Sequence, residues 1–181
     1  MLVRHLDIQP LLIACHTWRM SPWSLSTLVL ASCVILSSSQ QKNKQPQTIS
    51  RGWGKGITWV ATYEEGLRKM KENNKPLMVI HHKEDCPHSK SLKKLFAVDK
   101  AIQKIAKQDF IMLNLVEETT DSNLAPDGYY VPRILFVDPS MKVRADITSK
   151  YSNHLYTYQA SDLSVLVDNM KKAKLLLHTE L

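Results

Sequence analysis

The apolar positions of residues 51–175 fall into short continuous runs and longer periodic stretches. Three runs, 77–82, 110–116 and 133–137, are mainly apolar and contain β-branched residues. Such runs are typical of strands that are buried on both faces of a sheet. They predict the central strands of an α/β domain.

The periodic stretches predict helices. Thr62 followed three residues later by Glu65 is a capping-box arrangement, which predicts a helix from there to about Glu72. Further helices are expected from Cys86 and after Asp99, and Ser161 is expected to cap the last helix. The buried stripes of these last three helices are predicted to be Leu92, Leu95 and Phe96; Ile102, Ile105 and Ala106; and Leu163, Leu166, Val167, Met170, Ala173 and Leu177.

Turn residues separate these elements. Glycines at positions 52, 54 and 56 predict a bend around Trp53, which is expected to pack in the core together with Trp59. Residues 117–130 are polar and contain Pro-Asp-Gly, so they predict a long surface loop. The turn at 138–140 predicts an antiparallel hairpin between 133–137 and a further strand at 142–147. The expected order is α, β, α, β, β, β, α, with room for one more strand at the start.

The first 39 residues have the pattern of a signal peptide. The apolar stretch 25–36 is too short to span a bilayer comfortably, and it runs into three serines of the kind that signal peptidase accepts. A single membrane anchor and an internal core helix are the alternatives, and Met20 is an alternative start. Cleavage would leave no stable membrane anchor, a flexible polar arm at 40–50 and a domain at 51–181.

Composition and charge indicate one globular domain that does not bind nucleic acids. With 181 residues, of which 44% are hydrophobic and 23% charged, the chain suits one globular domain with a removable leader. Removing Arg4, Asp7 and Arg19 with the leader changes the formal net charge from +7 to +6. The lysines are scattered over predicted helices and no aromatic residues are interleaved with them, so nucleic-acid binding is not expected.

The cysteines point to one candidate site. Cys15 and Cys33 lie in the leader, so Cys86 alone remains in the expected mature chain, where it is reactive, paired between chains or inertly buried. It opens the sequence Cys86-Pro87-His88-Ser89, which has the form of a thioredoxin-type turn with serine in place of the second cysteine. Such a thiolate can form a mixed disulfide, but serine cannot resolve it.

The surroundings of Cys86 act on its thiol in opposite directions. The helix N-terminus, the Ser89 hydroxyl and a protonated His88 favour the thiolate, whereas Glu84 and Asp85 disfavour it. Pro87 suits the first helical position because its missing N–H needs no partner there.

Two other groups near this turn are informative. Val131-Pro132 directly precedes a predicted strand, where a cis-proline would face the active-site turn and the residue before it could pair with a substrate peptide. An ordinary trans proline at a strand start is the alternative. His81 and His82 are expected to point to opposite faces of the sheet, and no metal site or cofactor is predicted because a second ligand cluster is missing.

Two further features concern partners and location. Glu65 and Lys69 are four residues apart, which favours an ion pair within one helix, although a self-complementary patch could instead support a symmetric dimer. The chain ends in His178-Thr179-Glu180-Leu181, a variant of the Lys-Asp-Glu-Leu type of retention signal of the endoplasmic reticulum.

Over residues 46–181 the chain closely resembles the anterior gradient family of the protein disulfide isomerase superfamily. Residues 57–60 are similar to the third paralogue, whereas 86–89 are similar to the second. The matching motifs are Arg51-Gly52-Trp53-Gly54, Thr62-Tyr63-Glu64-Glu65, the segment 75–82, Cys86-x-x-Ser89, Pro126-Asp127-Gly128, Tyr130-Val131-Pro132-Arg133 and Thr179-Glu180-Leu181.

The resemblance implies a thioredoxin-like three-layer sandwich, in which a central mixed sheet is flanked by helices. It also implies a partly secreted resident of the endoplasmic reticulum that uses Cys86 to assist cysteine-rich secretory cargo such as mucins, with at most weak thiol–disulfide exchange activity. Homodimers and cell-surface receptor contacts are implied as well. A secreted adaptor that binds receptors without using the thiol is the alternative function.

Overall fold

The computed structural model describes residues 48–175. The predicted leader, most of the predicted arm, Leu177 and the C-terminal four residues lie outside this range. Among the described residues, no helix has both the length and the apolar composition needed to cross a membrane.

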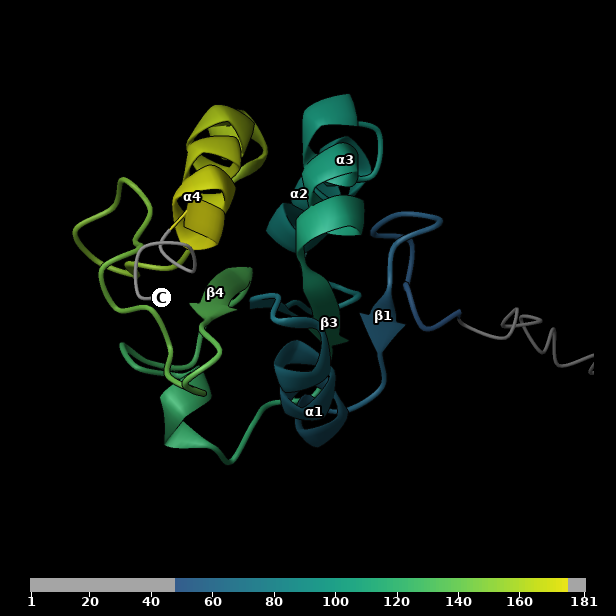
Figure 1. Ribbon diagram of the computed structural model, residues 1–181. Coiled ribbons are helices and arrows are strands. Elements are labelled where there is room, and N and C mark those ends of the chain that lie inside the picture. The colour runs from purple at the N-terminus through teal and green to yellow at the C-terminus, as the bar shows by residue number, and fades with distance from the viewer. Residues whose placement is uncertain (1–47, 176–181) are drawn as a thin grey trace, which may run out of the picture. The chain divides into compact units, whose positions relative to one another are not determined.

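A four-stranded mixed sheet forms the centre of the domain (Figure 1). Its strands are β1 (Trp59–Val60), β2 (Leu77–His81), β3 (Ile111–Leu115) and β4 (Arg133–Val137), in the spatial order β1-β3-β2-β4. β3 runs parallel to both β1 and β2, whereas β4 is antiparallel to β2. The short β1 is the additional N-terminal strand for which the sequence leaves room.

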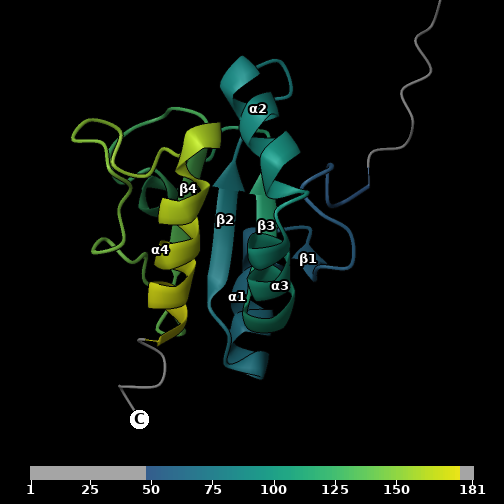
Figure 2. The ribbon, with the colours of Figure 1, turned by 90° about the horizontal axis from the view of Figure 1, so that it is seen from above.

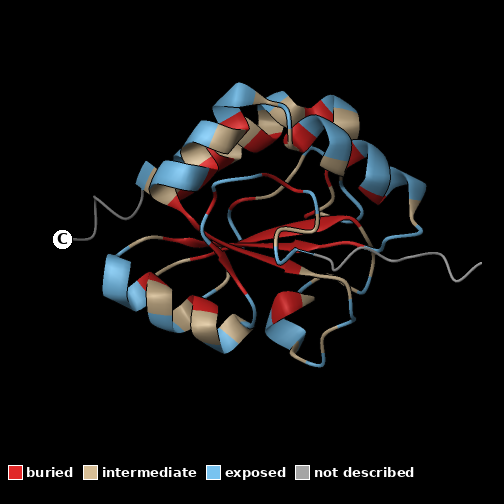
Figure 3. Cartoon of the chain, turned by 90° about the vertical axis from the view of Figure 1, so that its right-hand side faces the viewer, coloured by how far each residue is buried: buried red, intermediate tan, exposed pale blue. Residues whose placement is uncertain are grey.

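Helices cover both faces of this sheet (Figure 3). On one face, Met78 and Ile80 pack with residues of α2 (Pro87–Phe96), α3 (Lys100–Asp109) and α4 (Leu163–Leu175). On the other face, Leu77 and Val79 pack with α1 (Tyr63–Asn73) and the short helix η1 (Ser122–Leu124). Successive residues of β2 therefore point to opposite faces, as a strand requires. The result is the expected thioredoxin-like layering around a mixed sheet.

The start of α1 is capped much as the sequence predicts. The Thr62 hydroxyl accepts a hydrogen bond from the Glu65 N–H at 3.1 Å. The Glu65 carboxylate in turn accepts the N–H of Ala61, at 2.9 Å, rather than that of the cap residue. Both bonds satisfy N–H groups that have no partner inside the helix.

The predicted strand at 142–147 is wrong. Only a single bridge forms there, between Val137 and Val143. The chain then turns, because the Arg144 guanidinium forms two 2.8 Å hydrogen bonds with the Asp146 carboxylate and the Ile147 N–H bonds the Arg144 carbonyl. These local bonds end the pairing after one bridge.

The predicted cap of the last helix is also wrong. A 3₁₀ turn, η2 (Ala160–Asp162), precedes α4, and Gln159 is its N-cap. The Asp162 carboxylate accepts the Gln159 N–H at 2.9 Å, while Ser161 only donates its hydroxyl to the same carboxylate. A buried carboxylate that accepts several donors is a better cap acceptor here than the serine beside it.

Candidate active site

Cys86 lies between the carboxyl end of β2 and the start of α2. Figure 2 shows the β2 arrow pointing toward α2. It is the N-cap residue of α2, with Pro87 at the first helical position. The Lys90 N–H bonds the Cys86 carbonyl at 3.0 Å and so begins the helix. Cys86 is half-buried and is the free cysteine of the described residues.

The helix start makes the thiol more acidic. Partial burial would by itself raise the pKa of the Cys86 thiol, but the N–H and hydroxyl of Ser89 and the N–H of His88 outweigh it, so that the pKa lies below its ordinary value. The Cys86 side chain makes no capping hydrogen bond of ordinary geometry, and donors that lower a pKa do so by stabilising the thiolate. Asp85 opposes the shift.

Glu84 contributes less to this balance than the sequence suggests. Its carboxylate forms an ion pair with Lys93 of α2, with an Nζ–O distance of 3.1 Å. Glu84 therefore has a cation beside it that offsets its charge, and Asp85 is left as the acidic neighbour that raises the pKa of Cys86.

Ser89 occupies the position of a resolving cysteine and is fully buried. Its hydroxyl oxygen accepts the Lys83 N–H at a long 3.5 Å. Because a hydroxyl can accept and donate at once, its proton remains available for the Cys86 sulfur, where it lowers the thiol pKa. Ser89 thus stabilises a thiolate but supplies no second thiol.

Replacing Ser89 with alanine is expected to raise the pKa of Cys86 and to slow its alkylation several-fold at neutral pH. The backbone N–H groups would remain, so the shift would be partial. The iodoacetamide reaction rate measured against pH gives this pKa directly. Ser91→Ala, an exposed serine of the same helix, is the matched control. Equal pKa values in the two variants would contradict the role of the Ser89 hydroxyl.

The Val131–Pro132 peptide bond is cis, and this pair lies beside the cysteine turn. His88 from α2 and Val131 and Pro132 line one pocket of about 320 Å³. No hydrogen bond within residues 48–175 uses the N–H or C=O of Val131, whereas the Pro132 carbonyl accepts the Thr157 hydroxyl at 2.9 Å. The backbone of Val131 is thus free to pair with an extended peptide.

Hydrogen bonds hold the loop that forms the far wall of this pocket. The Tyr130 hydroxyl donates to the Asp127 carboxylate and accepts the Tyr156 N–H at 3.0 Å. The same carboxylate accepts the Leu155 N–H at 2.6 Å. The Tyr130 ring also stacks against the His154 ring, with centroids 4.2 Å apart. The segment after β4 is therefore fixed against the cis-proline loop.

Comparison with known proteins agrees with this geometry. Residues 58–139 match a family model described as thioredoxin-like. The chain is 60% identical over 154 residues to anterior gradient protein 3 of Mus musculus, covering 85% of this chain and 93% of that protein. It is 61% identical over 144 residues to the anterior gradient protein 2 homolog of Homo sapiens, covering 80% and 82%. The chain belongs to the anterior gradient family.

These identities establish the family, and with it a protein of the disulfide isomerase group, but they do not separate the two paralogues. Among solved structures, a thioredoxin from Thermus thermophilus superimposes with a TM-score of 0.46 at 12% identity, covering 65% of this chain and 86% of that one.

The other residues singled out in this anterior gradient protein do not line the pocket. Glu65 and Lys69 form the expected intrahelical ion pair of α1 at 3.1 Å, and a dimer through them stays a prediction. His81 and His82 are both buried, and His82 stacks edge-on against Trp53. Within residues 48–175 no group of three or more histidine, cysteine or acidic side chains could hold a metal ion.

The residues that complete the pocket are not predicted from the sequence. They lie in the irregular segment after β4, which carries no hydrophobic periodicity. The segment is rich in aromatic side chains and in side chains that form hydrogen bonds, and this composition is the one signal in the sequence. No local pattern indicates that the segment folds back to lie beside residues 86–89. The missed pocket residues are Tyr151, Asn153, His154, Thr157 and Gln159.

Proposed function

We propose that this protein captures secretory proteins through a mixed disulfide with Cys86 and thereby assists their folding and maturation. One observation carries the proposal. A half-buried thiol with a lowered pKa lies at a helix N-terminus, with a buried serine three residues later and an unpaired backbone segment at Val131 beside it.

The chemistry follows from Cys86 being the one thiol of the described residues. The Cys86 thiolate attacks one sulfur of a cargo disulfide, a new S–S bond forms to Cys86, and the other cargo sulfur leaves as a thiolate that takes up a proton. Ser89 cannot attack the mixed disulfide, so a second cargo thiolate must release Cys86. The cargo then holds a rearranged disulfide and has been neither oxidised nor reduced overall. Exchange of this kind is slow when the cargo offers no nearby thiol.

Peptide binding would accompany this step. An extended cargo strand can form backbone hydrogen bonds with Val131, and the side chain next to the cargo cysteine can enter the pocket between His88 and the segment 151–159. Backbone hydrogen bonds and one side-chain pocket depend on only a few residues of the cargo. Such contacts therefore suit a varied group of cysteine-rich secretory proteins, such as mucins.

The location is part of the same proposal. The predicted leader and the ending His178-Thr179-Glu180-Leu181 favour the lumen of the endoplasmic reticulum, with a secreted fraction. This compartment allows cargo disulfides to form and persist.

Trapping experiments test the proposal. Secretory cells expressing the wild type, Cys86→Ala or Ser89→Cys are quenched with an alkylating agent, and covalent complexes are recovered separately from lysate and medium for mass spectrometry. Cys86→Ala is expected to abolish the adducts. Ser89→Cys is expected to shorten their lifetime, because it supplies a resolving thiol.

Two outcomes would overturn the proposal. One is recovery of the same partners with Cys86→Ala in equal amount, which is what a thiol-independent adaptor at the cell surface would give. The other is a Cys86 that does not react with alkylating agents in the native protein.

A further inference from the structure

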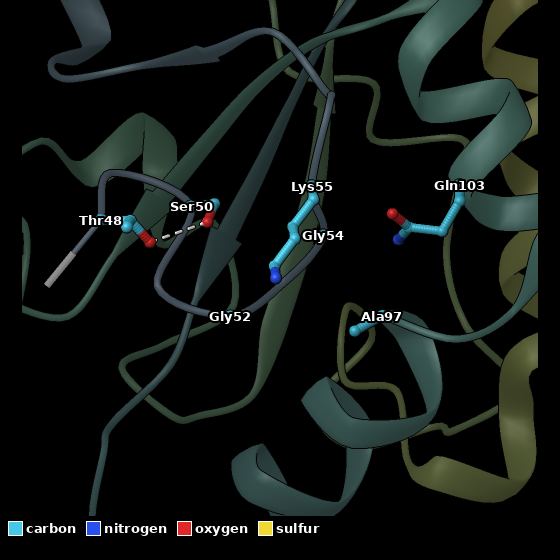
Figure 4. Close-up of a pocket in the computed structure, with 7 residues that line it drawn as sticks. All are labelled: Thr48, Ser50, Gly52, Gly54, Lys55, Ala97 and Gln103. Carbon is cyan, nitrogen blue, oxygen red and sulfur yellow. Dashed lines mark hydrogen bonds between the residues drawn. The ribbon is translucent and has the colours of Figure 1, made fainter.

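A second pocket lies away from Cys86, between the N-terminal loop and the junction of α2 and α3 (Figure 4). Its volume is about 680 Å³, and its wall is mainly apolar. Gly52, Gly54 and the stem of Lys55 form one side, and Ala97 and Gln103 form the other. The mechanism proposed for Cys86 uses none of these residues.

The glycine wall of this pocket is required by close packing. Gly54 has a φ of +151°, and a Cβ atom at this position would overlap the side chain of Gln103. The Gln103 amide connects the loop to the helices. Its Nε2 donates to the Trp53 carbonyl of the loop at 3.1 Å and to the Phe96 carbonyl of α2 at 2.9 Å. The pocket is thus a rigid feature of the fold, since the amide fixes both of its sides.

One side-chain acceptor in the pocket has no hydrogen-bond partner among residues 48–175. The Oε1 atom of Gln103 accepts no hydrogen bond from any residue in the range 48–175. Figure 4 shows this side chain reaching from α3 toward the loop at Gly54. It offers an acceptor for an N–H group, such as that of a peptide backbone, beside an apolar wall.

Lysines without an ion-pair partner in the described part of the chain lie in the pocket and along the adjoining side of α3. Lys55 lines it, and Lys100 and Lys107 lie one turn before and after Gln103 on the same side of α3. All three are exposed, and none forms an ion pair within the described part of the chain. The nearest carboxylate in sequence, Asp99, accepts the Ile102 N–H as the cap of α3. Asp99 keeps its negative charge as a cap, so three lysines against this one carboxylate leave a net positive charge around the pocket.

We propose that this pocket is a docking site for a protein segment that carries an apolar side chain flanked by carboxylates. The apolar wall and the Gln103 acceptor suit a peptide, and the three lysines complement acidic flanks. Polysaccharides and nucleic acids fit less well, because none of the described residues that line the pocket is aromatic, and sugars or bases would have no ring to stack on.

Fluorescence anisotropy of the purified protein tests this site with a labelled synthetic peptide. The probe has a Phe-Leu core flanked on each side by three glutamates. One control peptide replaces the core with Ser-Ser, and a second replaces the glutamates with lysines. The probe is expected to bind, and both control peptides are expected to bind far more weakly.

Matched variants locate the binding. The triple charge reversal Lys55→Glu, Lys100→Glu and Lys107→Glu is expected to weaken binding at least roughly tenfold at low salt. The control reverses three lysines elsewhere, Lys71, Lys75 and Lys142, and is expected to leave binding unchanged. For the apolar wall, Ala97→Phe fills the pocket and should also weaken binding, whereas Ala101→Phe, on the exposed side of α3, should not.

The outcomes separate this site from the thiol chemistry. Cys86→Ala should bind the probe as well as the wild type, so failure of the mixed-disulfide proposal would leave this result intact. Two results would show a purely electrostatic surface and overturn the proposal. The first is equal binding of the Phe-Leu and Ser-Ser peptides. The second is that heparin displaces the probe while the Ala97→Phe variant still binds it normally. Equal losses in the two triple variants would do the same.

Discussion

Lowering the pH from 7.5 to 5 is expected to reduce the free energy of unfolding by about 4 kcal/mol through two buried histidines. His81 and His82 are 2% and 1% exposed, and none of their ring nitrogens has a hydrogen-bond partner within the described residues. Burial, followed by the nearby Arg133 cation, lowers the pKa of His81 to about 3. Burial, followed by Lys93, lowers that of His82 to about 4. Glu84 and Asn114 oppose the shift at His82 only in part.

The sign follows from proton binding. A histidine in the unfolded chain takes up a proton below about pH 6.5, whereas these two stay neutral in the folded protein until the pH nears their lowered pKa values. Stability is therefore complete above pH 6.5 and is lost as the pH falls from 6.5 toward 4. At pH 5 each histidine contributes about 2 kcal/mol to this loss.

Urea unfolding at a series of pH values measures this effect. The double variant His81→Leu and His82→Leu should lose most of the pH dependence between 7.5 and 5. Its stability at pH 7.5 should stay within about 1.5 kcal/mol of the wild type, because leucine keeps both positions apolar and the aromatic contact of His82 with Trp53 is the interaction removed. His154→Gln, at an exposed histidine, should keep the wild-type pH dependence of stability. A double variant that keeps the full acid sensitivity would show that other groups cause it.

The sequence located the helices and central strands because their signals are local. The capping pair Thr62 and Glu65 and the apolar runs each depend on residues within a few positions of one another. The sequence leaves room for the short strand β1 but does not locate it, because two residues are too few to show the alternation of apolar and polar positions that marks a strand. The strand expected at 142–147 failed because the pairing of Arg144 with Asp146 favours a turn, and hydrophobic pattern does not register such a pair.

For the candidate site, the sequence predicts the reactive cysteine but not the residues that form the walls of the pocket beside it. The Cys86 turn was visible because a lone cysteine after a buried strand is a local pattern. The far wall of its pocket depends on contacts such as the bond between the Asp127 carboxylate and the Leu155 N–H, 28 residues apart. Burial of a charged side chain, as at Arg133, likewise depends on tertiary packing and has no sequence period.

Replacing Arg133 with methionine is expected to destabilise the protein by about 3 kcal/mol and to slow capture of cargo by Cys86. Arg133 is fully buried. Its Nη1 donates to the carbonyls of Gly128 at 2.9 Å and Tyr130 at 3.0 Å, which hold the loop that leads into Val131 and Pro132. Methionine has a similar length but no donor, so both carbonyls would lose their partner and the loop would loosen beside the thiol.

Two controls separate these bonds from the charge of Arg133. Arg133→Lys keeps the cation and has donors for both carbonyls, but its side chain ends one atom short of the Nη1 position, so it is expected to recover only part of the loss. Glu118→Gln removes the ion-pair partner of Arg133, which lies 3.4 Å away and is 42% exposed, and solvent screening should keep its effect below about 1 kcal/mol. Urea unfolding gives the change in stability. The rate of mixed-disulfide formation with a model disulfide peptide shows whether the loop that leads into Val131 and Pro132 has loosened. If Arg133→Met unfolds at the wild-type urea midpoint and captures the peptide at the wild-type rate, these carbonyls do not need the guanidinium, and the loop beside Cys86 is held by the Tyr130 and Asp127 network alone.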